Sequence, residues 1–235
     1  WPRGLTSDEM YSVSAHLMSM FYPPPSMTVP SAYPAGILAW YCCGMFDISA
    51  GTWPDVSGNG YTATLSGSGF AEVNSTGHGA PTNVTALSGT TSSRISFGAI
   101  IEGSFTVCLV ARYTGGTMRR LLQAGNRHWF HGHYYGNTGV AYYEGWKTAY
   151  QNNVSPNTDW VVMCGSNAGS QLKLVNGVDV GTATGGTGGV SLFVNGGDHK
   201  NEKSDFAIAE VVVWPRGLTD VEMRGVSEHL MNRLG

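Results

Sequence analysis

Short apolar segments separated by turn residues fill the chain from Gly36 to its C-terminus, and no other feature limits the possible folds as strongly. Roughly a dozen such segments occur, each with the length of a β-strand rather than a helix. In SFTVCLVARY, for example, Phe105, Val107 and Leu109 alternate with other residues and would share one face of a strand. Glycine contributes 33 of the 235 residues, as many tight turns require. We therefore expect an all-β fold, a sandwich of two antiparallel sheets.

A 20-residue segment occurs near both ends of the chain. WPRGLTSDEMYSVSAHLMSM and WPRGLTDVEMRGVSEHLMNR match at 13 of 20 positions with a constant offset of 213 residues, which chance does not produce. In each copy a threonine precedes a glutamate by three residues (Thr6 and Glu9, Thr219 and Glu222), the signature of a capping box. Apolar residues then recur at helical spacing. The sequence thus predicts a short capped helix at the N-terminal and the C-terminal ends.

The first copy has no domain before it in this sequence, and this position predicts a tandem array. We expect residues 1–22 to be the strand end and closing helix of a preceding repeat. Residues 23–35, PPPSMTVPSAYPA, predict a stiff, extended linker to a sandwich over residues 36–235. The chain begins with Trp1 rather than Met, as a mature product or a segment of something longer would. The alternative is a first helix that packs on its own domain, with no array.

Composition argues against two classes of partner and favours an extracellular protein. The formal net charge is −3 and the basic residues form no stripe, so nucleic acid is not an expected partner. No apolar run approaches the length of a membrane span. N-glycosylation sequons begin at Asn74, Asn83 and Asn153, all in turn-rich surroundings. We expect a secreted or cell-surface protein.

The cysteines leave two interpretations open. Their even number is compatible with disulfides in an oxidising compartment, and the candidates are Cys42, Cys43, Cys108 and Cys164. Because Cys108 and Cys164 lie within apolar segments, buried free thiols are the alternative. Zinc is not indicated, since no C-x₂-C pair exists.

Four motifs in order point to a known family. They are DVSGNGYTATLSG, SFTVCLVARY, LKLVNGVDVG and FAIAEVVVWPRGLTDVEM. These are similar to the opening turn, the first long central strand, the Val-Asn-Gly hairpin and the closing strand with its capped turn of laminin-G-like domains, in the concanavalin A-like lectin/glucanase superfamily. The resemblance covers residues 36–235 and implies a jelly-roll sandwich of two curved sheets. It fixes no function, because this fold carries lectins, enzymes and adhesion modules.

Two aromatic clusters, NRHWFHGHYYGN and YYEGWKTAYQ, are candidate glycan-binding sites. The candidate residues are Trp129, His131, His133, Tyr135, Tyr143 and Trp146. Aromatic rings cover the apolar faces of sugars, and nearby polar groups bind the hydroxyls. In a strand, Trp129, His131 and His133 share one face. Packing in the core or across paired strands is the simpler interpretation of both clusters, and a metal would need a third ligand that the sequence does not place.

No catalytic constellation is recognisable. The Glu-x-Asp-x-x-Glu run expected of the related glucanases is absent, and the carboxylates are scattered. We therefore expect no enzyme and no organic cofactor. The resemblance implies calcium as a family ligand, and Asp47, Asp55 and Asp205 are the candidate ligands. The alternative is that these acids only stabilise turns, which is the more common role of aspartate there.

The functional expectation follows from the repeated segment. We expect a non-catalytic extracellular repeat module of a larger secreted or cell-surface glycoprotein, structural or adhesive, in a tandem array or fibre. Its partners would be neighbouring copies of the domain or other extracellular proteins, and glycans. The alternative is a stand-alone lectin or carbohydrate-binding module, ahead of a polysaccharide-degrading enzyme.

Overall fold

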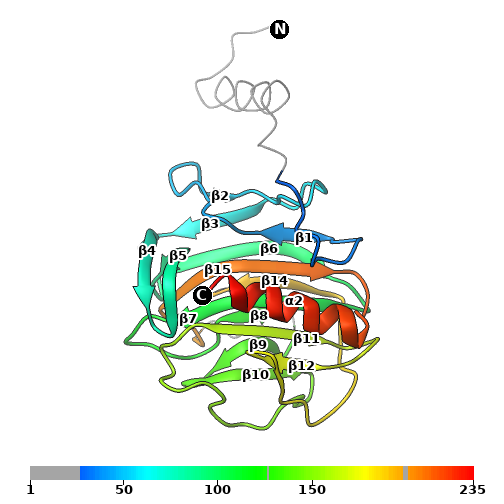
Figure 1. Ribbon diagram of the computed structural model, residues 1–235. Helices are drawn as coiled ribbons and strands as arrows, with labels where there is room; N and C mark the ends of the chain where they lie inside the picture. The colour runs from blue at the N-terminus through cyan, green and yellow to red at the C-terminus, as the bar shows by residue number, and fades with distance from the viewer. Residues whose placement is uncertain (1–26, 126, 198–200) are drawn as a thin grey trace, which may run out of the picture.

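Two antiparallel β-sheets pack face to face in the computed structural model, which describes residues 27–125, 127–197 and 201–235 (Figure 1). The larger sheet has the order β13-β12-β11-β7-β15-β5-β4, with β1 also beside β15, and the smaller sheet has the order β10-β9-β8-β14-β6-β3-β2. The larger sheet consists of β1 (Ala39–Tyr41), β4 (Ala71–Gly77), β5 (Ala80–Gly89), β7 (Thr106–Tyr113), β11 (Val161–Ser166), β12 (Lys173–Val175), β13 (Val178–Asp179) and β15 (Phe206–Trp214). The smaller sheet consists of β2 (Thr52–Trp53), β3 (Ala63–Gly67), β6 (Ser93–Ile101), β8 (Leu122–Ala124), β9 (Trp129–Tyr134), β10 (Asn137–Tyr143) and β14 (Val190–Val194). The predicted all-β sandwich is confirmed.

Apolar side chains from the facing sides of the two sheets form the inner core. Trp53 and Phe97 of the smaller sheet and Phe105, Leu109 and Ile208 beside or within the larger sheet are all buried in it. Full burial of one such side chain stabilises the fold by about 1.5–3 kcal/mol. The alternation of buried and exposed residues in β14 and in the first half of β6 follows from this packing, since one face of the smaller sheet is inward.

The central strands of the larger sheet are buried on both faces. Every residue of β7 and of β11 is buried. Their second face packs against helix α2 (Asp220–Asn232), which lies across the strands in Figure 1. Met223, Val226 and Leu230 of α2 meet Trp214 there in an outer core. Among the described residues, no helix is long and apolar enough to cross a lipid bilayer.

The predicted C-terminal capping box is present. The Thr219 hydroxyl accepts a hydrogen bond from the backbone N–H of Glu222 (3.3 Å), and the Glu222 carboxylate accepts one from the backbone N–H of Thr219 (2.8 Å). Arg216 adds a two-pronged ion pair to the same carboxylate. These contacts hold the pKa of Glu222 down at about 2, with the Arg216 hydrogen bonds as the largest cause. The helix expected in residues 1–22 lies outside the described residues.

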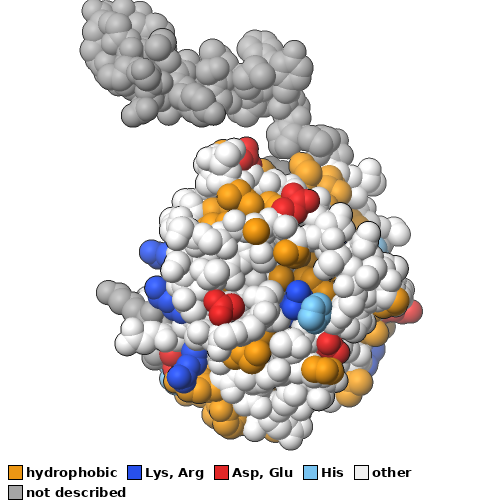
Figure 2. Space-filling view, turned by 90° about the vertical axis from the view of Figure 1, so that its left-hand side faces the viewer, with side chains coloured by type: hydrophobic (Ala, Val, Ile, Leu, Met, Phe, Trp, Pro, Cys, Tyr) orange, Lys and Arg blue, Asp and Glu red, His pale blue; other side chains and the backbone are white. Residues whose placement is uncertain are grey.

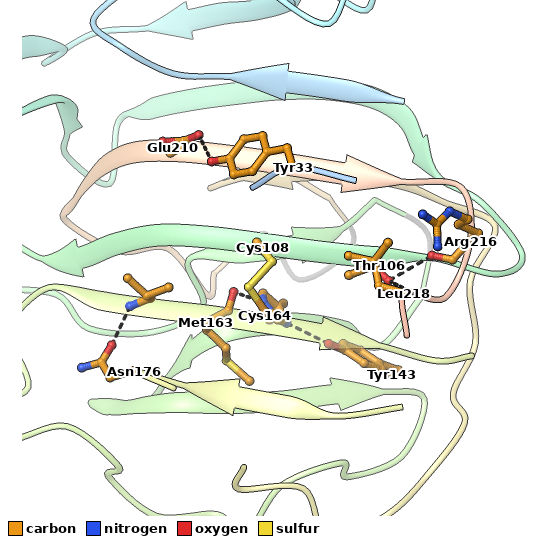
Figure 3. The surroundings of a disulfide bond; sticks show 12 residues. Tyr33, Thr106, Cys108, Tyr143, Met163, Cys164, Asn176, Glu210, Arg216 and Leu218 are labelled. Carbon is orange, nitrogen blue, oxygen red and sulfur yellow. Dashed lines mark hydrogen bonds between the residues drawn. A yellow bond between two sulfur atoms is a disulfide. The ribbon is translucent and has the colours of Figure 1, made fainter. Parts of the chain in front are cut away.

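Residues 27–35 belong to the domain and are not a free spacer, which corrects the linker expectation for this part of residues 23–35. Tyr33 is 5% exposed and packs edge-on against Trp40 and Trp214. Its hydroxyl donates a 2.5 Å hydrogen bond to Glu210, as Figure 3 shows. The Trp214 indole N–H donates to the carbonyl of Pro34. Proline-rich composition predicted an extended segment, but one aromatic residue anchors it on the outer core.

A bulge in β15 positions the carboxylate that receives Tyr33. The register against β7 shifts between Ile208 and Glu210. Before the shift Ile208 faces the inner core, and after it Val211 does, so Glu210 points to the outer face together with its neighbour Ala209. The other edge of β15 is shared between β5 and β1 at the same place. Glu210 is 3% exposed and also accepts hydrogen bonds from Trp40 and Arg233.

One disulfide joins the central strands. Cys108 of β7 and Cys164 of β11 lie opposite each other in the register and form a disulfide (Figure 3). Both cysteines belong to the outer core that α2 covers. Cys42 and Cys43, the other two candidates, have free thiols. Cys42 is buried beside Met27, and Cys43 lies 3.4 Å from the Arg233 guanidinium, so neither faces another cysteine across strands. The interpretation of Cys108 and Cys164 as buried thiols is thereby corrected.

Candidate functional site

Aromatic side chains gather on the outer face of the smaller sheet, along its β9–β10 edge. Tyr142 of β10 lies opposite Phe130 of β9, and both alternate with residues of the inner core, so they point away from it. The loop after β10 adds further rings. We call this set the aromatic surface; it comprises Phe130, Tyr134, Tyr135, Tyr142, Trp146 and Tyr150.

The rings of the aromatic surface hold one another in fixed orientations. Phe130 stacks between Tyr134 (centroids 4.4 Å apart, planes 17° apart) and Tyr142 (5.5 Å, 17°). Trp146 crosses this stack nearly at right angles, at 78° to Phe130 and 88° to Tyr142. Tyr150 lies 5.3 Å from Trp146, tilted by 46°. Each such pair contributes about 0.5–1.5 kcal/mol beyond its buried area, so the surface is rigid before any ligand arrives.

Buried rings support exposed ones within this surface. Phe130 has no exposed area, whereas Trp146 is 37% exposed, Tyr135 42% and Tyr150 56%. Exposed apolar side chains that lie together in one patch often mark a binding site. The exposed rings are therefore the part of the surface that a ligand can reach.

Four of the six predicted ligand-binding residues lie in the inner core instead. Trp129, His131, His133 and Tyr143 are at most 1% exposed. The His131 ring bonds the Tyr143 hydroxyl (2.8 Å) and the Met163 carbonyl (3.1 Å) across to the larger sheet. A glycan cannot touch a side chain without accessible area, so for these four the expectation is corrected. Tyr135 and Trp146 are the two that reach the aromatic surface.

The two core histidines are neutral because of burial. Burial lowers the pKa of His131 to about 4 and that of His133 to about 3. Neither ring nitrogen of His133 has a hydrogen-bond partner among the described residues. Its ring instead meets Tyr113 edge-on at 4.8 Å. This is a packing role that carries a desolvation cost.

The three calcium candidates sit in separate turns and use their carboxylates locally. Asp47 accepts from the backbone N–H of Ala50, and Asp55 from those of Trp40, Ser57 and Tyr61. Asp205 accepts from the backbone N–H groups of Thr91 and Thr117. Among the described residues, no group of three or more His, Cys, Asp or Glu side chains comes together. These three acids do not fit one shared calcium ion.

The sequons differ in their surroundings. Asn74 in β4 and Asn83 in β5 are exposed on one hairpin at the edge of the larger sheet. Asn153 is half-buried, and its amide nitrogen donates to the carbonyl of Gly139 at 2.9 Å. Two of the three side chains are thus open to modification in the folded chain.

Charged groups near the aromatic surface are mostly paired. Glu144 pairs with Arg127 at 3.0 Å, and Glu202 pairs with the buried Arg120, whose guanidinium lies over the ring of Phe130. The Arg119 guanidinium lies over the Tyr135 ring, with its central carbon 4.1 Å from the ring centroid. On the face shown in Figure 2, charged side chains are interspersed among uncharged ones and neither sign forms a continuous patch.

Four residues at this surface were not named individually as candidates from the sequence. They are Phe130, Tyr134 and Tyr142, which lie within the two aromatic clusters, and Arg119, which lies beside Tyr135. The signal for the first three was the alternation itself, because they occupy the strand positions between the inward-facing ones. Nothing in the sequence around Arg119 marked it, since its ring partner Tyr135 belongs to a different strand-to-strand connection.

Comparisons with known proteins identify the class of fold. No protein-family model and no curated protein sequence matches the chain. Domain 4 of AbnA, a GH43 extracellular arabinanase from Geobacillus stearothermophilus solved with arabinotriose, is similar in structure (TM-score 0.55, 17% identity, 82% of this chain and 98% of that one). Trypanosoma rangeli sialidase in complex with 2,3-difluorosialic acid is similar too (TM-score 0.56, 13% identity), but over 97% of this chain and 40% of the sialidase.

A third structure widens the class. The binding domain of Paraclostridial Mosquitocidal Protein 1 is similar with a TM-score of 0.51 and 12% identity, over 84% of this chain and 52% of that one. At these identities the likeness concerns the fold alone. The chain is a two-sheet antiparallel β-sandwich of the jelly-roll kind.

Proposed function

We propose that this chain is a non-catalytic, glycan-binding module of a secreted or cell-surface protein. The observation that carries the proposal is the aromatic surface, where Trp146, Tyr150 and Tyr135 are exposed beside the buried Phe130 and the half-buried Tyr134 and Tyr142. Apolar sugar faces pack on such rings, and fixed rings lose little conformational entropy when they bind. The similar arabinanase domain solved with arabinotriose and the similar binding domain of Paraclostridial Mosquitocidal Protein 1 support the proposal.

The surroundings of the nearest carboxylates support a non-catalytic role. A glycosidase needs a protonated acid with a raised pKa beside a second carboxylate. The pKa of Glu144 is lowered instead, by a hydrogen bond from the Thr187 side chain and then by Arg127. Glu202, the other carboxylate at this surface, is in an ion pair with Arg120. Neither is arranged as a general acid.

The extracellular part of the proposal rests on the disulfide and the sequons. A disulfide between Cys108 and Cys164 persists in oxidising compartments. Asn74 and Asn83 are exposed, as glycosylated asparagines must be. Within the sandwich class we propose a laminin-G-like domain, which the order of the four sequence motifs supports.

The test is a substitution of Trp146, the least exposed of the three exposed rings. Trp146→Ala should lower the affinity for the best glycan found in a panel of soluble polysaccharides by about ten-fold or more, because binding hot spots are typically buried aromatic contacts. Titration calorimetry measures this. Val178→Ala, at a 64% exposed apolar position on the larger sheet, is the matched control and should bind as the parent does. Equal binding by the Trp146 variant, or no glycan bound at all, would contradict the proposal.

A second candidate function, compatible with the first, is a repeat in a tandem structural or adhesive array. It is favoured by the copy of the α2 segment at residues 1–20, which preserves Thr6 and Glu9 of the capping box. Its partners would be neighbouring copies of the same domain. Mass measurement of the native polypeptide, reduced and deglycosylated, tests it. A far heavier chain with a proline-rich peptide after Gly235 would support the array, and a native chain near 25.0 kDa would contradict it.

A further inference from the structure

The exposed rings of the aromatic surface do not share a plane. Trp146 and Tyr150 are tilted by 46° to each other, and Tyr134 lies at 61° to the first and 56° to the second. Tyr135 stands at 64° to Tyr134. The face of a crystalline polysaccharide is flat, so it can lie against only one of these tilted rings at a time. In a single twisted glycan chain, successive sugar units face different directions, so such a chain can contact several of the rings.

The two ends of the surface also differ in chemistry. At one end lie the rings of Trp146 and Tyr150, residues that are 37% and 56% exposed. At the other end, Arg119 covers a face of Tyr135 and so replaces a stacking surface with hydrogen-bond donors. Tyr134 joins the ends, with ring centroids 4.6 Å from Tyr135 and 6.1 Å from Trp146.

The Arg119 guanidinium is poised for a ligand. No carboxylate lies within ion-pair distance of it among the described residues, whereas Arg120 and Arg127 both have one. The contact with the Tyr135 ring restrains the guanidinium. Its N–H groups form no hydrogen bond with the described residues. A guanidinium fork of this kind binds two adjacent oxygens, either a pair of vicinal hydroxyls or a carboxylate.

Resting on the proposed function, we propose that the aromatic surface binds one soluble glycan chain of at least two sugar units in a fixed direction, and not a crystalline polysaccharide. One sugar stacks on Trp146 and Tyr150, and a later sugar of the same chain places two adjacent oxygens against Arg119. A monosaccharide reaches only one of the two ends. Arg119 thus determines the length of chain that binds best.

The experiment measures affinity against chain length for wild type, Arg119→Ala, Arg119→Lys and Trp146→Ala. The probes are one-unit to six-unit oligosaccharides of the best-binding sugar from the soluble panel, together with microcrystalline cellulose and chitin powders. Arg224→Ala removes an exposed arginine from α2, on the larger sheet, and is the charge-matched control. Folding is checked by circular dichroism. The backbone of Arg119 keeps its bonds to Ser204 and Tyr113 in every variant.

Affinity should rise with length until the chain spans both ends and then level off, and the powders should not retain the protein. Arg119→Ala should lower the affinity for long chains about ten-fold while leaving the one-unit ligand unchanged, and Arg119→Lys should recover only part because it lacks the fork. Trp146→Ala should weaken binding at every length. Retention on crystalline powder, a monosaccharide bound as tightly as the longest chain, or an Arg119→Ala variant equal to wild type would overturn this inference and leave glycan binding standing. Binding of no soluble or crystalline glycan would overturn both.

Discussion

At the scale of single residues, the core of this sandwich contains two imidazoles that burial keeps uncharged. His131 uses both ring nitrogens, toward Tyr143 and Met163, and His133 uses neither. An unpaired buried polar atom costs about 1–3 kcal/mol. An apolar side chain of similar size in place of His133 would therefore not lower the free energy of unfolding at neutral pH.

The histidines make stability depend on pH. In the unfolded chain a histidine binds its proton near pH 6.5, but in the fold the pKa values are about 4 and about 3. The unfolded state thus takes up protons first, and the free energy of unfolding should fall as the pH drops from 6.5 to 5, by up to about 1.4 kcal/mol per pH unit for each histidine. Urea unfolding across this range measures it. His133→Leu should reduce the slope by up to half, whereas His78→Asn, at an exposed position, should leave it unchanged.

The outcome at β9 shows what residue patterns can decide. That Trp129, His131 and His133 share a face was predictable from the period of a strand, and they do share one. Which face looks outward was not, because Phe130 on the other side is also fully buried, beneath Trp146 and Tyr134. Because neither side of this strand consists of polar residues, the alternation of side chains does not indicate which side faces solvent. Tyr134 ends the same strand, but Trp146 comes from the loop after β10, and the sequence does not show the path of that loop.

At the scale of elements, β7 and β11 are joined both by their ladder and by a covalent bond. Cys108 and Cys164 close a loop across 56 residues of sequence, which contains β8, β9 and β10. In the chain-entropy account a loop of this length stabilises the fold by about 4 kcal/mol. The disulfide thus restricts the conformations open to the unfolded segment that contains the strands of the aromatic surface.

Removing the disulfide should be costly. The double variant Cys108→Ala, Cys164→Ala should lose about 4 kcal/mol in the free energy of unfolding, measured by urea titration without reductant. Cys43→Ser, at a free thiol, should change it by less than about 0.5 kcal/mol. A double variant as stable as the parent would mean that the two thiols are unlinked in solution.

Local chemistry made some elements predictable. The Asn176-Gly177 hairpin forms as expected, with positive φ at both residues (46° and 80°), and the capping box of α2 needs only Thr219 and Glu222. The disulfide pairing was not predictable, because it depends on which strands become neighbours. Nor was the division of one edge of β15 between β5 and β1, which depends on the bulge before Glu210.

At the scale of the whole molecule, the domain begins earlier than its composition indicates. Residues 27–35 cover the outer face of the larger sheet through Tyr33, whose hydroxyl reaches Glu210 beside the bulge. Burial and the hydrogen bond to Glu210 both raise the pKa of this hydroxyl, so it remains a donor across the physiological range. The Tyr33 ring also packs edge-on against His229 of α2, so the segment and the helix meet in the outer core.

Loss of this anchor should destabilise the entire sandwich. Tyr33→Ala should lower the free energy of unfolding by about 3 kcal/mol, as large-to-small changes in a core do. Val29→Ala, in the same segment but 43% exposed, should have little effect. Urea titration of both variants distinguishes a packed segment from a spacer, since a spacer would tolerate both changes equally.

The anchoring of Tyr33 also limits how consecutive domains could be arranged. If residues 1–22 close a preceding sandwich and the chain rests on the next one from residue 27, only Pro23, Pro24, Pro25 and Ser26 connect the two. At about 3.1 Å per residue, a proline-rich connection of that length spans about 12 Å. Neighbouring domains would follow one another at a nearly constant step and rotation. A polymer of them would present its aromatic surfaces along a regular screw. Under the proposed function, a long glycan would engage several of these surfaces at once only where its own repeat matches that pitch.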